Sequence, residues 1–161
     1  MAYTVAMSEH ELQATPNNNF DHVLLHQFLN GGQPSAIASN PLAASLAGYL
    51  LQVDRGAGTV QMRFAPDDRF LQGNGVIQGG IVCAMLDFAM AFAVMARLRL
   101  GEAATTVNLN ASFLRSARQG IYFASGYLDR LGNNLAFSHA SLAAADGSIV
   151  ATACSTLKVF R

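Results

Sequence analysis

Apolar positions along this chain follow two patterns, one typical of strands and one typical of a buried helix. Residues 46 to 55 and 59 to 65 are short strand-like runs with glycines between them, which predicts a hairpin. Residues 79 to 98 form a longer, almost continuous apolar run, which predicts a buried helix. Four more strand-like runs follow, separated by turn residues, at residues 105 to 114, 121 to 130, 136 to 145 and 149 to 160.

The order of these elements predicts the fold class. Asp146 and Gly147, between the last two runs, form a dipeptide typical of a tight hairpin turn, which favours antiparallel pairing. A helix this apolar must be covered by other elements on most sides. We therefore expect an α+β fold in which an antiparallel β-sheet wraps around a long central α-helix.

The first forty residues have a different character. The chain is polar and irregular up to about Asn19, and residues 21 to 29 show a short amphipathic helical pattern that ends at Gly31 and Gly32. We expect residues 1 to 40 to form an N-terminal appendage with a short helix, and residues 41 to 161 to form the main domain.

The hydrophobic content and the charge of the chain indicate which kinds of partner it can bind. The 161 residues are 52% hydrophobic and 12% charged, which is enough apolar material for one well-filled core. So few charges leave little solvating surface, and we expect another subunit to cover part of the apolar area in a homo-oligomer. The formal net charge of +0 and the lack of a basic run exclude nucleic acid as the main partner.

The long apolar run does not predict a membrane span, because it opens on glycines and carries Asp87 at its centre. The N-terminus lacks the basic start and longer apolar run of a secretory signal, so a cytoplasmic location is expected. Cys83 and Cys154 are far apart in sequence and both lie in apolar surroundings, which favours reduced cysteines over a disulfide.

Asp87 is the strongest candidate for chemistry. Burying an ionised carboxylate in an apolar interior is unfavourable by several kcal/mol unless the group is paired, hydrogen-bonded or reached by water. That cost favours a catalytic role for Asp87. The alternative is that Asp87 lies on a solvated or subunit-facing strip and pairs with an arginine or an amide.

Several motif residues accompany Asp87 at a recognisable spacing, namely Gly75, Gly79, Gly80, residues 106 to 110 and residues 113 to 117. With the order of the elements, they resemble the hotdog-fold acyl-CoA thioesterases of the phenylacetate-pathway (PaaI-like) family. The similarity runs from about Pro41 to the C-terminus. It implies an acyl-CoA substrate, no cofactor or metal, and a homodimer that often pairs into a dimer of dimers.

The residues of the motif fit thioester hydrolysis. The first N–H groups of a helix are free, and the helix N-terminus carries partial positive charge, so the amide of Gly79 or Gly80 can polarise a thioester carbonyl. Asp87 can activate water as a general base or attack the carbonyl as a nucleophile. Gly79 and Asp87 lie about 12 Å apart along a helix, too far to touch one carbonyl, so we expect two chains to share each site.

Two positions depart from the pattern of the family. Gln78 stands where the family usually has a histidine, and an amide can hydrogen-bond but cannot titrate. Gln72 stands where the family usually has a loop asparagine, whose part Asn74 could take. Thr106 matches the family's hydroxyl position and could bind the attacking water. Alternatively, Gln78 caps the helix, Asn74 makes a loop hydrogen bond and Thr106 reflects strand propensity.

Coenzyme A needs cationic or amide contacts for its phosphates. The residues expected to supply them lie at strand ends, and they are Arg115, Arg118, Arg130 and Asn133. Apolar residues of the helix could line an acyl pocket or simply form core, and these are Met85, Phe88, Met90 and Phe92.

Other sites have weaker support in the sequence. Residues 73 to 78 lack the third glycine of a dinucleotide loop, and His22 and His26 lack a third clear metal ligand. His139 lies mid-strand without a nucleophile elbow. Three hypotheses remain, in order: an acyl-CoA thioesterase, a non-catalytic acyl-CoA-binding or sensing module, and a hydratase or dehydratase.

Overall fold

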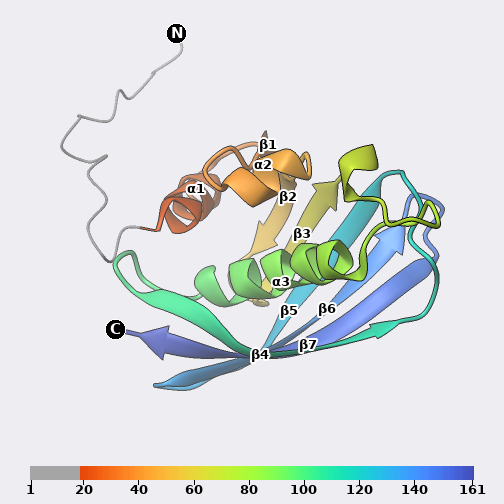
Figure 1. The fold of residues 1–161 in the computed structure, drawn as a ribbon. Helices are drawn as coiled ribbons and strands as arrows, with labels where there is room; N and C mark the ends of the chain where they lie inside the picture. Colours follow the sequence, from red (N-terminus) through yellow and green to blue (C-terminus); the bar gives the residue numbers. More distant parts are fainter. Residues whose placement is uncertain (1–18) are drawn as a thin grey trace, which may run out of the picture.

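The computed structural model describes residues 19–161, and within them the chain forms one antiparallel sheet of seven strands (Figure 1). The strand order across the sheet is β1-β2-β3-β5-β6-β7-β4, so β4 is an edge strand although it lies midway along the chain. The strands are β1 (Ser35–Ala36), β2 (Tyr49–Asp54), β3 (Thr59–Phe64), β4 (Ala103–Phe113), β5 (Tyr122–Leu131), β6 (Leu135–Ala144) and β7 (Ile149–Phe160).

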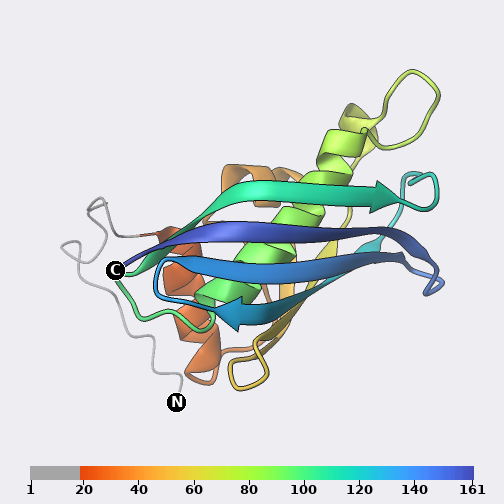
Figure 2. The same ribbon diagram turned by 90° about the horizontal axis from the view of Figure 1, so that it is seen from below.

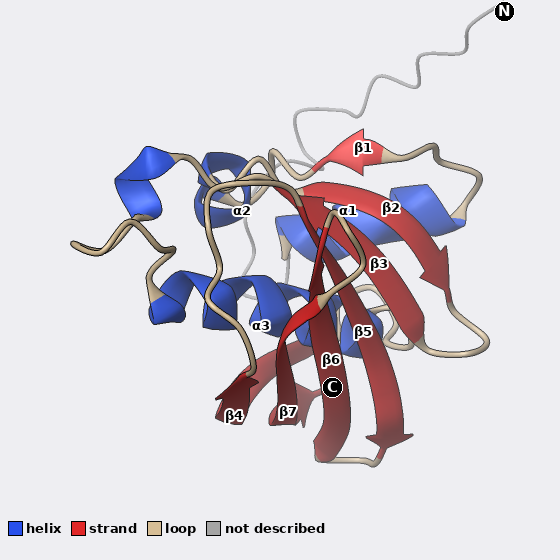
Figure 3. Ribbon diagram, turned by 90° about the vertical axis from the view of Figure 1, so that its right-hand side faces the viewer, coloured by secondary structure: helices blue, strands red, loops and turns tan. Residues whose placement is uncertain are grey.

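The sheet curls around one long helix, α3 (Gly79–Met95), as Figures 2 and 3 show. The helix contacts five strands, β3 to β7, and its apolar side chains form the centre of the core. The closest approach is at Gly126 of β5, where an added Cβ would lie 2.0 Å from the carbonyl oxygen of Ala89. The predicted hotdog architecture is therefore confirmed.

The entry into the first long strand was predicted wrongly. Residues 46 to 48 were expected in a strand, but a short helix, α2 (Pro41–Ser45), ends at Leu46, and β2 starts at Tyr49. The helix has a clear local cause, because the Asn40 side chain accepts hydrogen bonds from the first turn and Pro41 has a backbone suited to a helix start. The two-residue strand β1 was not predicted either.

The N-terminal helix α1 (Phe20–Leu29) packs into the same core as the sheet. Leu25 is fully buried there, and β1 pairs with β2 just after the helix. Asp21 accepts hydrogen bonds from Ser39 (2.6 Å) and Asn40 (2.9 Å), which ties α1 to the start of α2. His22 is buried against the carbonyl of Glu102 (Nδ1 to O, 3.2 Å), and burial lowers the pKa of its imidazole.

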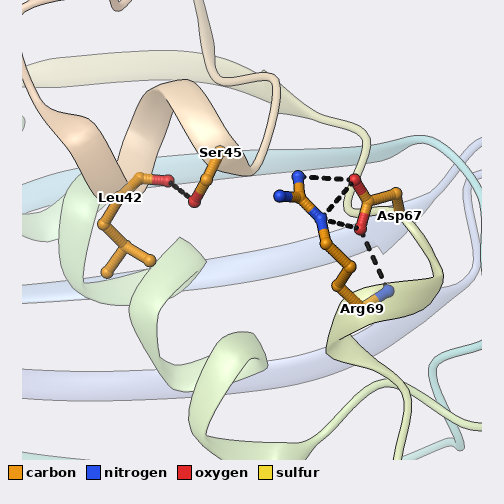
Figure 4. A network of polar contacts seen from close by, with 4 residues as sticks. All are labelled: Leu42, Ser45, Asp67 and Arg69. Carbon is orange, nitrogen blue, oxygen red and sulfur yellow. Dashed lines mark hydrogen bonds and ion pairs between the residues drawn. The ribbon is translucent and has the colours of Figure 1, made fainter.

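The loop between β3 and α3 consists of turns that are held by hydrogen bonds and contact the start of α3. Arg69, in the short 3₁₀ helix η2 (Asp68–Phe70), binds the Asp67 carboxylate through Nη2 at 2.7 Å, while Ser45 of α2 donates to the Leu42 carbonyl (Figure 4). The Gln78 N–H donates to the Phe70 carbonyl at 2.8 Å. The bond from Gln78 holds the residue before α3 against the loop.

The helices of residues 19–161 include none that is long and apolar enough to cross a membrane.

Candidate active site

Asp87 lies in the middle of α3, half-buried, and faces strand β4. The hydroxyl of Thr106 donates a hydrogen bond to its Oδ1 at 2.8 Å. Burial raises the pKa of the Asp87 carboxyl, and the hydrogen bond from Thr106 opposes that rise by stabilising the charged form. A carboxylate with a raised pKa and a free oxygen is a suitable base for activating water.

Asp87 belongs to the half-exposed side of α3. Gly79, Cys83, Asp87 and Ala91 follow one another at i+4 spacing, and all four are partly exposed, whereas most of the helix is buried. Partial burial raises the pKa of the Cys83 thiol, and the Asp87 carboxylate raises it further, as expected for neighbours on one face. We call these four residues the α3 strip. Each residue of this strip keeps part of its surface exposed in the described chain, although Thr106 contacts Asp87 and the Phe113 ring lies beside Gly79.

The start of α3 presents unpaired backbone donors. Neither Gly79 nor Gly80 donates its N–H to an acceptor within residues 19–161. An added Cβ at Gly80 would meet nothing within 4 Å, and one at Gly79 would make only ordinary contact with the Phe113 ring at 3.5 Å. Packing within the chain therefore does not require either glycine. The space beside these amides is open to a ligand oxygen or to a second chain.

A cavity of about 390 Å³ opens beside Gly79. Its apolar wall comes from the loop, from α3 and from the end of β4, and its polar side includes Gln72, Arg115 and Ser116. A second cavity of about 340 Å³ shares Arg115 and Ser116 with the first, and Arg118 also lines it. The apolar lining of the first cavity consists of Val76, Ile77, Val82, Phe113, Leu114 and Ala117. Arginine side chains therefore line both cavities, together with Asp146 in the second.

Residues 74–151 match the model of the thioesterase superfamily. A crystal structure from Ralstonia eutropha JMP134, described as a thioesterase related to phenylacetic acid degradation, is 36% identical to this chain. The alignment covers 83% of this chain and 98% of the other, with a TM-score of 0.73. The chain belongs to the thioesterase superfamily. Its enzyme class is thus thioester hydrolase, and the resemblance inferred from the motif residues is confirmed.

More distant relatives share the fold of this thioesterase. The thioesterase HI1161 of Haemophilus influenzae is 22% identical over 78% of this chain and 86% of its own, with a TM-score of 0.71. The Escherichia coli PaaI protein, from the phenylacetic acid degradation operon, is 15% identical over 89% of this chain and 96% of its own, also with a TM-score of 0.71. No curated protein matches the sequence.

The loop residues expected in the thioesterase site lie around the start of α3. Gln72 lines the cavity beside Gly79. The Asn74 side chain accepts a hydrogen bond from the Val76 N–H (3.4 Å), so it has a local role in the loop. Gln78 occupies the N-cap position, but its exposed side chain makes no capping hydrogen bond, and it lines a separate cavity of about 270 Å³ with Arg69.

The four residues expected to bind phosphates do not form one cluster in the chain. Arg115 and Arg118 precede β5 and lie at the end near Gly79. Arg130 and Asn133 lie at the other end of β5, about 30 Å away for a strand of ten residues. The expectation was based on position at strand ends, and the sequence does not show which end. Only the strand direction in the folded sheet separates the two pairs.

The four apolar helix residues expected near the acyl group are mainly core. Met85, Met90 and Phe92 are almost completely buried, and only Phe88 is half-exposed, with its ring 6.0 Å from that of Phe64. The cavity uses Phe113 and its neighbours instead, which sequence reasoning noted as part of the motif without giving them a role. Side chains alternate between the two faces of a strand, so Leu109, Ala111 and Phe113 of β4 share one face. This pattern in the sequence could have indicated that Phe113 lines the cavity.

The remaining histidines and cysteines make other contacts. His22 and His26 lie 4.8 Å apart between ring centroids and face backbone carbonyls. His139 bonds Asp129 at 2.7 Å on the outer side of the sheet. In the described part of the chain, no three His, Cys, Asp or Glu side chains are grouped to hold a metal ion, and both cysteines are free.

Proposed function

We propose that this thioesterase hydrolyses an acyl-CoA or aryl-CoA thioester to the free acid and CoA. The N–H of Gly79 or Gly80 donates a hydrogen bond to the carbonyl oxygen as negative charge develops on it, and Asp87 of a second chain activates the attack. The observation that carries the proposal is that helix α3 holds two groups suited to thioester hydrolysis. These are the half-buried Asp87 carboxylate, which accepts a hydrogen bond from Thr106, and the free backbone amides at the start of the helix. A well-placed amide donor contributes about 3 kcal/mol to an oxyanion transition state.

In the general-base route, Asp87 takes a proton from water while the water oxygen bonds to the carbonyl carbon. The C–S bond then breaks, and the leaving thiolate takes the proton from the Asp87 carboxyl, which returns to its ionised form. In the nucleophilic route, an Asp87 oxygen bonds to the carbonyl carbon, the thiolate leaves, and water hydrolyses the resulting anhydride. Both routes use the same amides for the carbonyl oxygen, and both need Asp87 ionised.

Two chains are needed for either route. Gly79 and Asp87 are eight residues apart on one helix, or about 12 Å along its axis. A two-fold axis between antiparallel α3 helices would place Asp87 of each chain beside the glycine amides of the other. The proposed enzyme is therefore a homodimer, or a dimer of dimers, with two equivalent sites in each pair.

The two cavities, which share Arg115 and Ser116, support a direction for the substrate. The thioester carbonyl would lie at Gly79, with Gln72 and Asn74 in the adjoining loop and Gln78 at the helix start. The phosphates of CoA would lie near Arg115 and Arg118, where guanidinium groups supply charge and hydrogen bonds. Arg130 and Asn133 are too distant in the same chain to share that role.

Thiol release from a panel of aryl-, short-, medium- and long-chain acyl-CoAs tests the proposal, with wild type compared with Asp87→Asn. Asparagine keeps the acceptor for Thr106 but cannot take a proton or attack the carbonyl. We expect turnover to fall by at least about a thousandfold, while circular dichroism and subunit mass stay unchanged. Equal turnover by the two proteins would refute the role of Asp87.

A binding module is the second candidate, because Gln78 cannot move a proton as the family histidine could. Isothermal titration with CoA and a non-hydrolysable acyl-CoA analogue separates the two candidates. Tight binding without thiol release from any thioester would favour the module over the enzyme.

A further inference from the structure

Strand β4 contains a β-bulge beside the candidate base. Between Thr106 and Asn108 the pairing with β7 shifts by one residue, so Val107 is an extra residue without its own partner on that strand. A bulge re-aims the side chains next to it, and bulges are common beside active sites. This bulge directly follows Thr106, the residue whose hydroxyl donates to Asp87.

The bulge decides which face of β4 carries Thr106. Successive side chains of a regular strand point to opposite faces, so residues an odd number of positions apart lie on different faces. Thr106 and Leu109 are three positions apart, yet Leu109 packs against the core around α3 and Thr106 reaches Asp87 of that helix. The extra residue between them allows both orientations. A regular strand over the same residues that kept Leu109 in the core would turn Thr106 to the outer face.

Two side chains hold Asn108, the residue that follows the bulge. Ser155 of β7, which is 5% exposed, donates its hydroxyl to the carbonyl oxygen of Asn108 at 2.8 Å. The Asn110 side chain donates to Oδ1 of Asn108 at 2.9 Å. The bond from Ser155 crosses from one strand to the other, whereas the bond from Asn110 stays within β4. A shift of the bulge along β4 would leave the buried Ser155 hydroxyl without this acceptor, which costs free energy.

We propose that Ser155 is a positioning residue of the site. Its hydroxyl fixes the place of the bulge, and the bulge directs the Thr106 hydroxyl to Asp87. A bulge on the other side of Thr106 would leave Leu109 in the core and turn Thr106 outward. The value of this contact for catalysis rests on the proposed function, in which Asp87 is the base or the nucleophile. The placement of Thr106 by the bulge does not depend on it.

Ser138 of β6 provides a matched control. It lies directly opposite Ser155 in the sheet and is also buried, but its hydroxyl has no hydrogen-bond partner within residues 19–161. Ser155→Ala and Ser138→Ala therefore remove the same atom from neighbouring buried positions, and only the first removes a bond to β4. Ser155→Thr keeps the hydroxyl and tests rescue by a conservative change.

The titration of Asp87 reports on its contact with Thr106. Burial raises the pKa of the Asp87 carboxyl and the bond from Thr106 lowers it, and no charged side chain of the described residues is among the causes. The nearby Cys83 thiol has a raised pKa and stays neutral while Asp87 titrates. Carbon-13 NMR of the Asp87 carboxyl against pH should give a higher pKa in Ser155→Ala than in wild type, because the Thr106 hydroxyl is no longer held in place. Ser138→Ala and Ser155→Thr should titrate as wild type does.

A double variant separates positioning from a general loosening of the fold. If Ser155 acts through Thr106, Ser155→Ala should not change the Asp87 titration of a Thr106→Val protein. An unchanged Asp87 pKa in Ser155→Ala, or an equal rise with and without the Thr106 hydroxyl, would overturn the proposal. If Ser155→Ala does not fold, Ser155→Cys fills the same space with a weak donor and should raise the Asp87 pKa in the same direction.

The NMR titration needs no substrate, so it is independent of thiol release. A raised Asp87 pKa in Ser155→Ala, with no hydrolysis by wild type or with an unmoved acid limb of kcat/KM, would refute the proposed function and leave the positioning role intact. Hydrolysis that requires Asp87, with the same Asp87 titration in Ser155→Ala and wild type, would do the reverse.

Discussion

At the scale of single residues, the hydrogen bond from Thr106 affects the protonation of Asp87. Burial alone would hold Asp87 protonated to a higher pH, which would remove the base from the reaction. The hydroxyl of Thr106 donates to the charged form and so lowers that pKa. Its lone pairs are still available to a water molecule, so the role expected for Thr106 in binding the attacking water stays a prediction.

Thr106→Val should move the acid limb of the pH–rate profile to higher pH. The variant loses the donor that stabilises ionised Asp87, so the pKa of the carboxyl rises and less of the active form is present below it. The measurement is kcat/KM against pH for one good acyl-CoA substrate. Thr106→Ser keeps the hydroxyl and should keep the wild-type limb. A limb that moves to lower pH in Thr106→Val would contradict this account.

At the scale of the elements, two glycines differ in how closely their surroundings are packed. At Gly126 the backbone of β5 meets that of α3, and any side chain would displace the helix. Gly73 in the loop before α3 has open space around the position of a Cβ and no special backbone angle. Substitution at Gly126 therefore tests the close packing of β5 on α3, and substitution at Gly73 is a control for the loss of a glycine as such.

Gly126→Ala should lower the free energy of unfolding by about 3 kcal/mol or more, because a carbon 2.0 Å from the Ala89 oxygen forces the elements apart. Gly73→Ala should change it by less than about 0.5 kcal/mol. Urea unfolding followed by circular dichroism gives both values. Similar stability of the two variants would show that the contact between α3 and β5 relaxes at little cost.

The direction of β5 also predicts which arginine contacts CoA. Arg118→Ala should raise KM for an acyl-CoA about three- to tenfold, because a charged contact to phosphate is lost. KM for the matching acyl-pantetheine, which lacks the nucleotide, should stay constant. Arg130→Ala, at the other end of the strand, should leave both values within twofold. A larger effect at Arg130 than at Arg118 would contradict the proposed substrate direction.

At the scale of the whole molecule, the proposed site requires assembly of two chains. A single chain has a carboxylate and two free amides on one helix, but their separation prevents them from acting on one carbonyl. The uncharged edge of β4 and the α3 strip are the surfaces through which a second copy could complete the site. Activity and dimerisation should therefore be lost together on dilution.

Mixed dimers test whether two chains share each site. Gly79→Pro removes one amide donor at the first position of α3, where proline fits a helix and where Gln78 already has an extended backbone (φ −57, ψ 134). Gly79→Pro and Asp87→Asn should each be nearly inactive. Random exchange of their subunits should restore about a quarter of the wild-type rate, since half of the dimers then hold one intact site.

Gly79→Ala keeps the N–H and is the control for Gly79→Pro. Full activity of Gly79→Pro alone would assign the donor to Gly80. No recovery after exchange, with mixed dimers verified by mass, would show that each site belongs to one chain.

The sequence by itself determined the features that depend on neighbours along the chain. The period of the apolar residues predicted α3 and six strands, and Asp87 within the apolar run predicted the centre of the candidate site, which stays a prediction. Gly79 and Gly80 predicted free amides at the helix start for the same local reason. Even the short helix α2, which was missed, has its causes in adjacent residues, Asn40 and Pro41.

Only the tertiary structure decided the features that join distant residues. It brought Thr106 to Asp87, set Arg118 and Arg130 at opposite ends of the sheet, and packed Leu25 of α1 into the common core. It also made β4 an edge strand, which its place midway along the chain does not indicate. The physical reason is that strand pairing and helix burial are settled by the summed packing of the whole chain, whereas periodicity and capping act within a few residues.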